Sequence, residues 1–130
     1  MVTRPAGQAA HFATALSAQG AIPVLYPVLE IRDLDDVTPV LDAAIRLDSF
    51  DLAVFVSPNA IEKALALILA RRTWPGGLRV AALGKSSERE LERHGIREVL
   101  SPPLRFDSDA LLELPELTAV AGKRVIIFRG

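Results

Sequence analysis

The sequence contains no cysteine and only two histidines. Without cysteine it can form neither a disulfide framework nor a thiolate metal site, and its composition is compatible with a reducing compartment. His11 and His94 are isolated, because no second ligand lies at the spacing that a metal site requires. We therefore expect no bound metal and no other cofactor.

The sequence also lacks an excess of charge of one sign and a long apolar run. Its 15 basic and 16 acidic residues are interspersed and give a net charge of -1, which excludes the single-sign field that concentrates nucleic acid or anionic lipid. No apolar stretch is long enough to cross a bilayer, and the N-terminus carries no apolar signal segment. We expect a cytoplasmic protein that binds neither nucleic acid nor a membrane.

Short apolar runs alternate with segments of helical period. Their composition is typical of strands buried on both faces. The runs occupy residues 52–57, 79–84, 98–100 and 123–128. Between the first two runs, apolar residues recur at helical spacing, at Ile61, Ala64, Leu65 and Ile68. This alternation predicts an α/β fold with a doubly wound parallel sheet.

Local signals predict where helices begin and end. Thr38 before Pro39 predicts an N-cap at Thr38, and Ser87 followed by Glu90 matches a capping box. Gly95 is predicted to close the helix that begins near Ser87.

The first 31 residues fit the alternation less well. Pro27 would delete a hydrogen bond from a central strand, so the segment 24–31 suits an edge strand or a ribbon between domains.

Only Met1 and Val2 precede the first turn, and Arg129-Gly130 stands where a helix should begin. We therefore expect the chain to be a fragment.

Small polar residues or glycine stand where the predicted strands end and helices begin. In an open α/β sheet such turns share the carboxyl edge and present helix N-termini to anions. Capping explains each turn equally well, since Ser57 suffices as an N-cap and so does Asn59 with Glu62. The occurrence of several such turns at one edge of the sheet favours a ligand site. The turns are Thr3-Arg4, Ser57-Pro58-Asn59, Gly84-Lys85-Ser86-Ser87 and Arg129-Gly130.

Other chemistry is not indicated. Gly84-Lys85-Ser86 matches the end of a phosphate-binding P-loop, but the first glycine of that motif would fall at Arg79, inside a predicted strand. No combination of nucleophile, base and orienting residue is visible, so no catalytic residue is assigned. Ser101-Pro102-Pro103 is interpreted only as a loop.

In their order and spacing, Thr3-Arg4-Pro5, Ser57-Pro58-Asn59-Ala60 and Arg129-Gly130 resemble the uroporphyrinogen-III synthase family of tetrapyrrole biosynthesis. The resemblance covers the whole chain and stops before the family's second half. It implies two α/β domains joined by a two-stranded ribbon. Residues 1–23 would be the first βα unit of an incomplete domain 1, residues 24–31 the ribbon, and residues 32–130 a flavodoxin-like domain 2 without its last helix.

The resemblance also implies an activity. Members of the family are carbon–oxygen lyases that close the linear tetrapyrrole hydroxymethylbilane, with loss of water and inversion of its last pyrrole ring, without a cofactor. Ser87 takes the threonine position of the family's Gly-x-x-Thr-Ala turn, and Glu88 replaces a small residue. The substrate-binding residues implied by the motifs are Thr3, Arg4, Ser57, Pro58, Asn59, Gly84 and Ser87.

Two alternatives remain open from the residues alone. The chain could be a non-catalytic α/β module that binds a small anionic ligand at the strand ends, or a regulatory half-domain. If the synthase interpretation holds, the partner of this chain is the remainder of the same polypeptide, and the fragment alone is expected to be inactive.

Overall fold

The computed structural model describes residues 1–129. The chain divides into two compact units, Met1–Asp35 and Asp36–Gly130. Gly130, the last residue of the predicted Arg129-Gly130 turn, lies outside the described residues.

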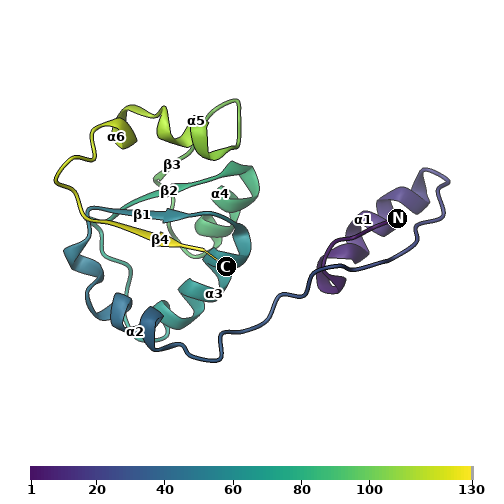
Figure 1. Ribbon diagram of the computed structural model, residues 1–130, viewed down its shortest axis with the longest axis horizontal. Coiled ribbons are helices and arrows are strands. Elements are labelled where there is room, and N and C mark those ends of the chain that lie inside the picture. Colours follow the sequence, from purple (N-terminus) through teal and green to yellow (C-terminus); the bar gives the residue numbers. More distant parts are fainter. Residues whose placement is uncertain (130) are drawn as a thin grey trace. The chain divides into compact units, whose positions relative to one another are not determined.

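The larger unit is an α/β domain, and all strand pairs in its sheet are parallel, which confirms the predicted fold class (Figure 1). The strand order is β3-β2-β1-β4. The strands are β1 (Leu52–Phe55), β2 (Arg79–Ala82), β3 (Val99–Leu100) and β4 (Val125–Phe128). The helices are α2 (Thr38–Ile45), η1 (Leu47–Ser49), α3 (Pro58–Leu69), α4 (Gly84–Arg93), α5 (Ser108–Leu112) and α6 (Pro115–Thr118).

Helices cover both faces of the sheet. Alternate side chains of a strand point to opposite faces, so each face has its own apolar cluster. Ala53 and Phe55 of β1 pack in one cluster with residues of α2, α3 and α4. Leu52 and Val54 pack in a second cluster with Leu111 of α5 and with residues of α6. The chain therefore crosses from β1 to β3 on one face and returns to β4 on the other, as a doubly wound sheet requires.

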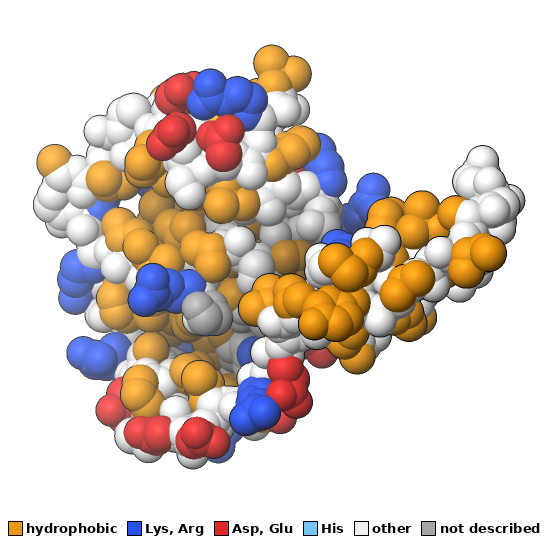
Figure 2. Space-filling view, turned by 45° about the vertical axis from the view of Figure 1, so that its right-hand side comes forward, with side chains coloured by type: hydrophobic (Ala, Val, Ile, Leu, Met, Phe, Trp, Pro, Cys, Tyr) orange, Lys and Arg blue, Asp and Glu red, His pale blue; other side chains and the backbone are white. Residues whose placement is uncertain are grey.

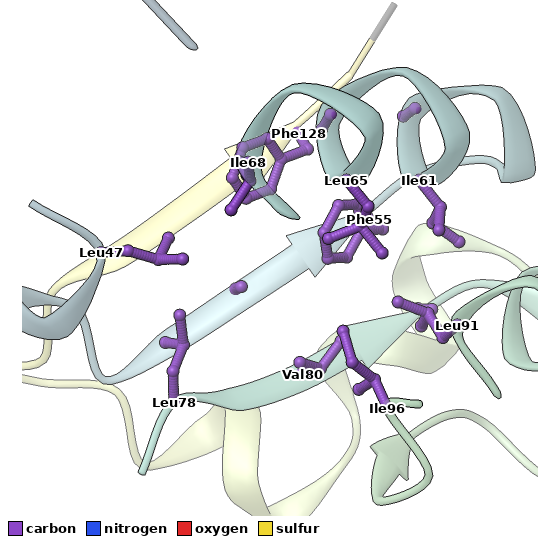
Figure 3. Packing of buried hydrophobic residues seen from close by; sticks show 14 of the residues in the cluster. Leu47, Phe55, Ile61, Leu65, Ile68, Leu78, Val80, Leu91, Ile96 and Phe128 are labelled. Atoms are coloured by element: carbon purple, nitrogen blue, oxygen red, sulfur yellow. The ribbon is translucent and has the colours of Figure 1, made fainter. Parts of the chain in front are cut away.

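The larger cluster is the main core, and Figure 3 shows its side chains converging between α3 and the sheet. The Phe55 ring stacks on the Phe128 ring with centroids 4.7 Å apart. Ile61, Leu65 and Ile68 of α3 are fully buried. These are residues that the helical spacing predicted to share one face, so that prediction is confirmed.

Strand β4 is not buried on both faces, and the prediction is wrong for this strand. Val125 and Ile127 are 36% and 60% exposed, whereas their β1 partners Leu52 and Val54 are buried. The reason is position, because within residues 1–129 β4 pairs with β1 alone and forms an edge of the sheet. An apolar run has the same appearance in an edge strand and in a central strand.

The helix ends agree with the sequence in part. Gly95 has φ 82, and its N–H donates to the Glu92 carbonyl at 2.9 Å, so it closes α4 as predicted. At α2 the predicted cap is wrong by one residue, since Val37 is the N-cap. The Thr38 N–H instead donates to Asp36 Oδ1 at 2.8 Å, so the acidic side chain acts as the local acceptor.

The smaller unit contains α1 (Ala6–Ala18) and an extended segment. The segment 24–31 forms no strand; Leu25 makes an isolated parallel bridge with Val2, and the Tyr26 N–H donates to the Val2 carbonyl at 2.8 Å. Val2 and Ala9 are the buried hydrophobic residues of this unit. Figure 2 shows apolar side chains over much of its surface. The exposed large hydrophobic residues in this unit are Met1, Phe12, Ile22, Val24, Leu25, Tyr26, Val28, Leu29, Ile31 and Leu34.

Candidate functional site

The register of the sheet brings the strand-end turns of the larger unit to one edge. Phe55 pairs with Ala82 on one side and with Phe128 on the other, and Ala81 pairs with Leu100. Because the strands are parallel, the residues that follow them lie at the same carboxyl edge, where α/β proteins bind ligands. The segments at this edge begin at Val56, Leu83, Ser101 and Arg129.

The turn after β1 satisfies most of its own hydrogen-bonding groups. Ser57 is the N-cap of α3, as predicted, and its Oγ accepts a hydrogen bond from the Ala60 N–H at 3.1 Å. The Ile61 N–H donates to the Ser57 carbonyl at 3.2 Å, and Pro58 has no N–H to offer. Asn59, the alternative cap, lies inside the helix. The Ser57 hydroxyl hydrogen is therefore one donor that this turn can offer to a ligand.

The turn after β2 is built differently. Helix α4 begins at Gly84, its N-cap is Leu83, and no side chain caps its first turn. The first N–H groups of a helix have no partner within the helix, and the macrodipole places partial positive charge there. Gly84 has φ 83, a conformation that favours glycine, and it turns the chain from strand into helix. This uncapped turn is the better candidate for binding an anion.

Ser87 lies inside α4, so the prediction of a capping box with Glu90 is wrong. The Glu90 carboxylate pairs instead with Arg93 at 2.9 Å. Ser87 is 0% exposed, and its Oγ has no hydrogen-bond partner. A buried hydroxyl without a hydrogen-bond partner costs about 1–3 kcal/mol of stability. Folding alone therefore does not explain why a serine stands at position 87.

A charged pair flanks Ser87. Lys85 Nζ lies 2.9 Å from Glu88 Oε2. The Ser101 hydroxyl and then the Lys85 ammonium hold the pKa of the Glu88 carboxyl below its usual range. Ser101 Oγ has no partner at hydrogen-bond geometry, so it acts on Glu88 as a nearby dipole. The negative charge that Glu88 adds to this turn is thus balanced by Lys85.

Sequence reasoning missed the segment after β3. Ser101 follows β3 directly, and its Oγ is buried without a hydrogen-bond partner. Phe106 packs on Gly84, because a Cβ added to Gly84 would lie 3.7 Å from Phe106 Cβ and Cγ. The position of Ser101 at a strand end was a signal that could have identified it. Nothing in the sequence indicates Phe106, whose position depends on the path of the loop.

Thr3 and Arg4 belong to the smaller unit. Both are exposed, and the Thr3 carbonyl accepts a hydrogen bond from the Val28 N–H at 3.3 Å. Pro5 is the N-cap of α1, and no side chain caps this helix. Of the predicted site residues, the structure brings Ser57, Pro58, Asn59, Gly84 and Ser87 to one edge of the larger unit and holds Thr3 and Arg4 in the other unit.

Other features of the described residues lie apart from these turns. A hollow lined in part by Trp74, Arg79 and His94 lies at the amino ends of β2 and β3. Residues 1–129 contain no group of three or more potential metal-binding side chains. None of the helices within this range has the length and apolar character needed to traverse a bilayer.

The chemistry available at the carboxyl edge is hydrogen-bond donation. The turn after β2 offers helix N–H groups and Ser57 adds a hydroxyl, whereas the hydroxyls of Ser87 and Ser101 are buried. Oriented donors of this kind bind carboxylates and stabilise negative charge on a departing group, without transferring a proton themselves.

Comparison with known proteins assigns the chain to a family. Residues 10–130 match the family described as uroporphyrinogen-III synthase HemD. The uroporphyrinogen-III synthase of Salmonella typhimurium is 30% identical over a matched region of 131 positions, which covers 100% of this chain and 53% of that protein. The enzyme of Escherichia coli is 29% identical with the same coverage, and that of Chlorobaculum parvum is 32% identical over 100% of this chain and 52% of its own length. The chain thus spans about half the length of these curated relatives, and it belongs to the uroporphyrinogen-III synthase family.

Proposed function

We propose that the polypeptide containing these residues is a uroporphyrinogen-III synthase, which closes hydroxymethylbilane with loss of water and inversion of the last pyrrole ring. The observation that carries the proposal is the uncapped N-terminus of α4, at the same sheet edge as the Ser57-Pro58-Asn59 turn, in a chain that belongs to this family. Family membership favours this enzyme over a non-catalytic anion-binding module.

The turn after β2 is the proposed carboxylate site. Its first N–H groups donate no hydrogen bond to a capping side chain, so they are left for a ligand's charge. Pairing of Lys85 with Glu88 leaves the turn without a net side-chain charge, so binding depends on oriented dipoles. Ser87 is fully buried, and we propose that substrate binding moves the residues over this turn and gives the Ser87 hydroxyl its partner.

The proposed chemistry is steering. The linear substrate loses its hydroxyl and cyclises readily without protein, giving the uninverted isomer, so the enzyme must favour one geometry of closure. Holding the two ends of the substrate together supplies the proximity that selects this geometry. Donors such as the Ser57 and Ser87 hydroxyls stabilise the departing oxygen. No side chain needs to act as a base in this scheme.

The domain division belongs to the proposal as well. Residues 1–23 are assigned to domain 1, residues 24–31 to the ribbon, and residues 32–130 to domain 2. Thr3 and Arg4 would bind the substrate from domain 1, and the remainder of the polypeptide would complete that domain. The division into compact units between Asp35 and Asp36 supports two separately packed parts. A cytoplasmic location stays a prediction.

The test is the isomer of the product. The full-length polypeptide, incubated with hydroxymethylbilane, should give a clear excess of uroporphyrinogen III over a protein-free control, in which spontaneous closure gives the uninverted isomer. The same assay on the 130-residue chain should give the control ratio, because one domain is incomplete. An isomer ratio for the full-length protein equal to that of the control would refute the proposed function.

A further inference from the structure

Phe106 is a half-exposed aromatic residue beside the uncapped turn of α4. Its side chain lies on the open side of Gly84, where a Cβ built on that glycine would lie 3.7 Å from Phe106 Cβ and Cγ and 3.9 Å from Cδ1, so there is room for a methyl group between the two. The residue is 49% exposed, so part of it packs on the helix N-terminus and part of it faces solvent. The half-exposed ring therefore lies beside the turn that is proposed to bind a carboxylate.

The loop around Phe106 is anchored on both sides. Pro102 is fully buried. Arg105 pairs with Glu113 at 3.2 Å, and Asp107 Oδ1 accepts a hydrogen bond from the Ala110 N–H at 2.8 Å, which caps α5. Phe106 stands between these anchors, which hold the ends of its loop while the ring between them shifts as a substrate binds.

Two buried hydroxyls belong to the elements on either side of this turn, Ser87 in α4 and Ser101 after β3. Ser87 Oγ and Ser101 Oγ are the buried side-chain polar atoms that lack a hydrogen bond within residues 1–129. Ser87 is in the helix that Phe106 covers, and Ser101 begins the segment that carries Phe106. An unsatisfied hydroxyl in the helix whose first residue lies near Phe106 suits a ligand that combines flat apolar rings with polar substituents.

We propose that Phe106 is a substrate-stacking residue, whose exposed ring packs against a pyrrole ring while the α4 turn binds a carboxylate of the same molecule. The inference rests on the proposed function, because it requires a ligand with aromatic rings and carboxylates. Ring-on-ring packing adds to affinity beyond the area that it buries. Phe106 thereby fixes which pyrrole ring lies over the α4 turn.

The experiment compares variants of the full-length polypeptide by anaerobic titration with uroporphyrinogen III and by the KM for hydroxymethylbilane. Phe106→Ala should raise both the product Kd and the KM about three- to tenfold, with kcat changed less. Phe106→Leu keeps an apolar cover on Gly84 but has no aromatic face, so it should resemble the alanine variant. Phe106→Tyr should bind like the wild type. Leu104→Ala, at an 86% exposed position in the same loop, is the matched control and should change nothing.

The outcomes separate this inference from the proposed function. Wild-type protein that binds no uroporphyrinogen III overturns both. Wild-type binding with unchanged or tighter binding by Phe106→Ala overturns the stacking role alone, and tighter binding would indicate that the ring blocks the turn. Full binding by Phe106→Leu would also overturn it, because the residue would then only cover Gly84.

Discussion

The turns that open α3 and α4 carry the same kind of sequence signal but differ in structure. Both follow a buried strand, and each contains a serine that the sequence assigns to a helix cap. In α3 the Ser57 hydroxyl caps the helix at 3.1 Å. In α4 no side chain caps the first turn, and the Ser87 hydroxyl is buried without a partner.

This difference shows that helix capping explains the serine in the first turn and does not explain the serine in the second. Ser57 contributes to stability whether or not a ligand binds, because it satisfies an N–H that the helix leaves open. Ser87 lowers stability unless something else pairs with it. A residue that is unfavourable for the fold is the better candidate for a role in binding. Four measurements on variants of these two turns test the contrast.

The largest expected change in stability comes from Gly84→Ala. The left-handed φ of Gly84 is unfavourable for a residue with a Cβ, so the free energy of unfolding should fall by about 1–2 kcal/mol. The added Cβ meets Phe106 only at ordinary contact distance, so backbone strain is the cause. Urea denaturation would measure the loss. Gly76→Ala, where the added Cβ meets nothing within 4 Å, is the control, and an equal loss in both variants would contradict the strain argument.

Ser57→Ala should have the next largest effect. Loss of the cap on the Ala60 N–H should lower the free energy of unfolding by about 1 kcal/mol. Ser57→Asp should retain most of the stability, because a carboxylate accepts the same hydrogen bond. If alanine and aspartate at this position are equally destabilising in urea denaturation, the contribution of Ser57 does not come from capping.

A smaller, pH-dependent effect is expected at Glu88. Its pKa is lowered in the folded chain by the Ser101 hydroxyl and by Lys85, so its contribution is present above the unfolded pKa of about 4.3. The contribution is lost as the pH falls through the folded pKa. A pair of this spacing contributes about 0.2–0.5 kcal/mol.

The measurement is the free energy of unfolding of wild type and Glu88→Gln between about pH 3 and 7. The difference between the two should be present at neutral pH and should vanish in acid. The exposed Glu92, changed to Gln on the same helix, serves as the control. A difference that is independent of pH would exclude the charged pair as its source.

The smallest effect on stability, and the most informative, is expected for Ser87→Ala. Since Ser87 Oγ has no partner to lose, the free energy of unfolding should change by less than about 0.5 kcal/mol or should rise. In the full-length protein the same variant should weaken uroporphyrinogen III binding. A loss of about 1 kcal/mol, as for a cap, with unchanged product affinity would show that Ser87 is structural and would remove the contrast with Ser57.

The contrast between β1 and β4 shows another limit of sequence patterns. Both strands are short apolar runs, and the sequence assigns the same burial to both. All four residues of β1 are buried, whereas Val125 and Ile127 of β4 are exposed because β4 is an edge strand. Strand order is a long-range property, so no local pattern could distinguish them.

Residue patterns alone correctly predict the fold class, the approximate positions of the strands, the apolar face of α3 and the helix end at Gly95. Each of these depends on residue spacing or on one backbone conformation, and such signals are local. The sequence also placed the turns after β1 and β2 at one edge, because the carboxyl ends of parallel strands coincide.

The tertiary structure alone decided how those turns are completed. It made Ser57 a cap and Ser87 a buried hydroxyl, because the helix start at Gly84 moved Ser87 inside α4. It also brought Phe106 onto Gly84, residues 22 positions apart in the sequence, through the pairing of β2 with β3 and the anchored loop that follows. Contacts of this kind depend on the whole sheet being assembled, and residue patterns within one segment carry no information about them.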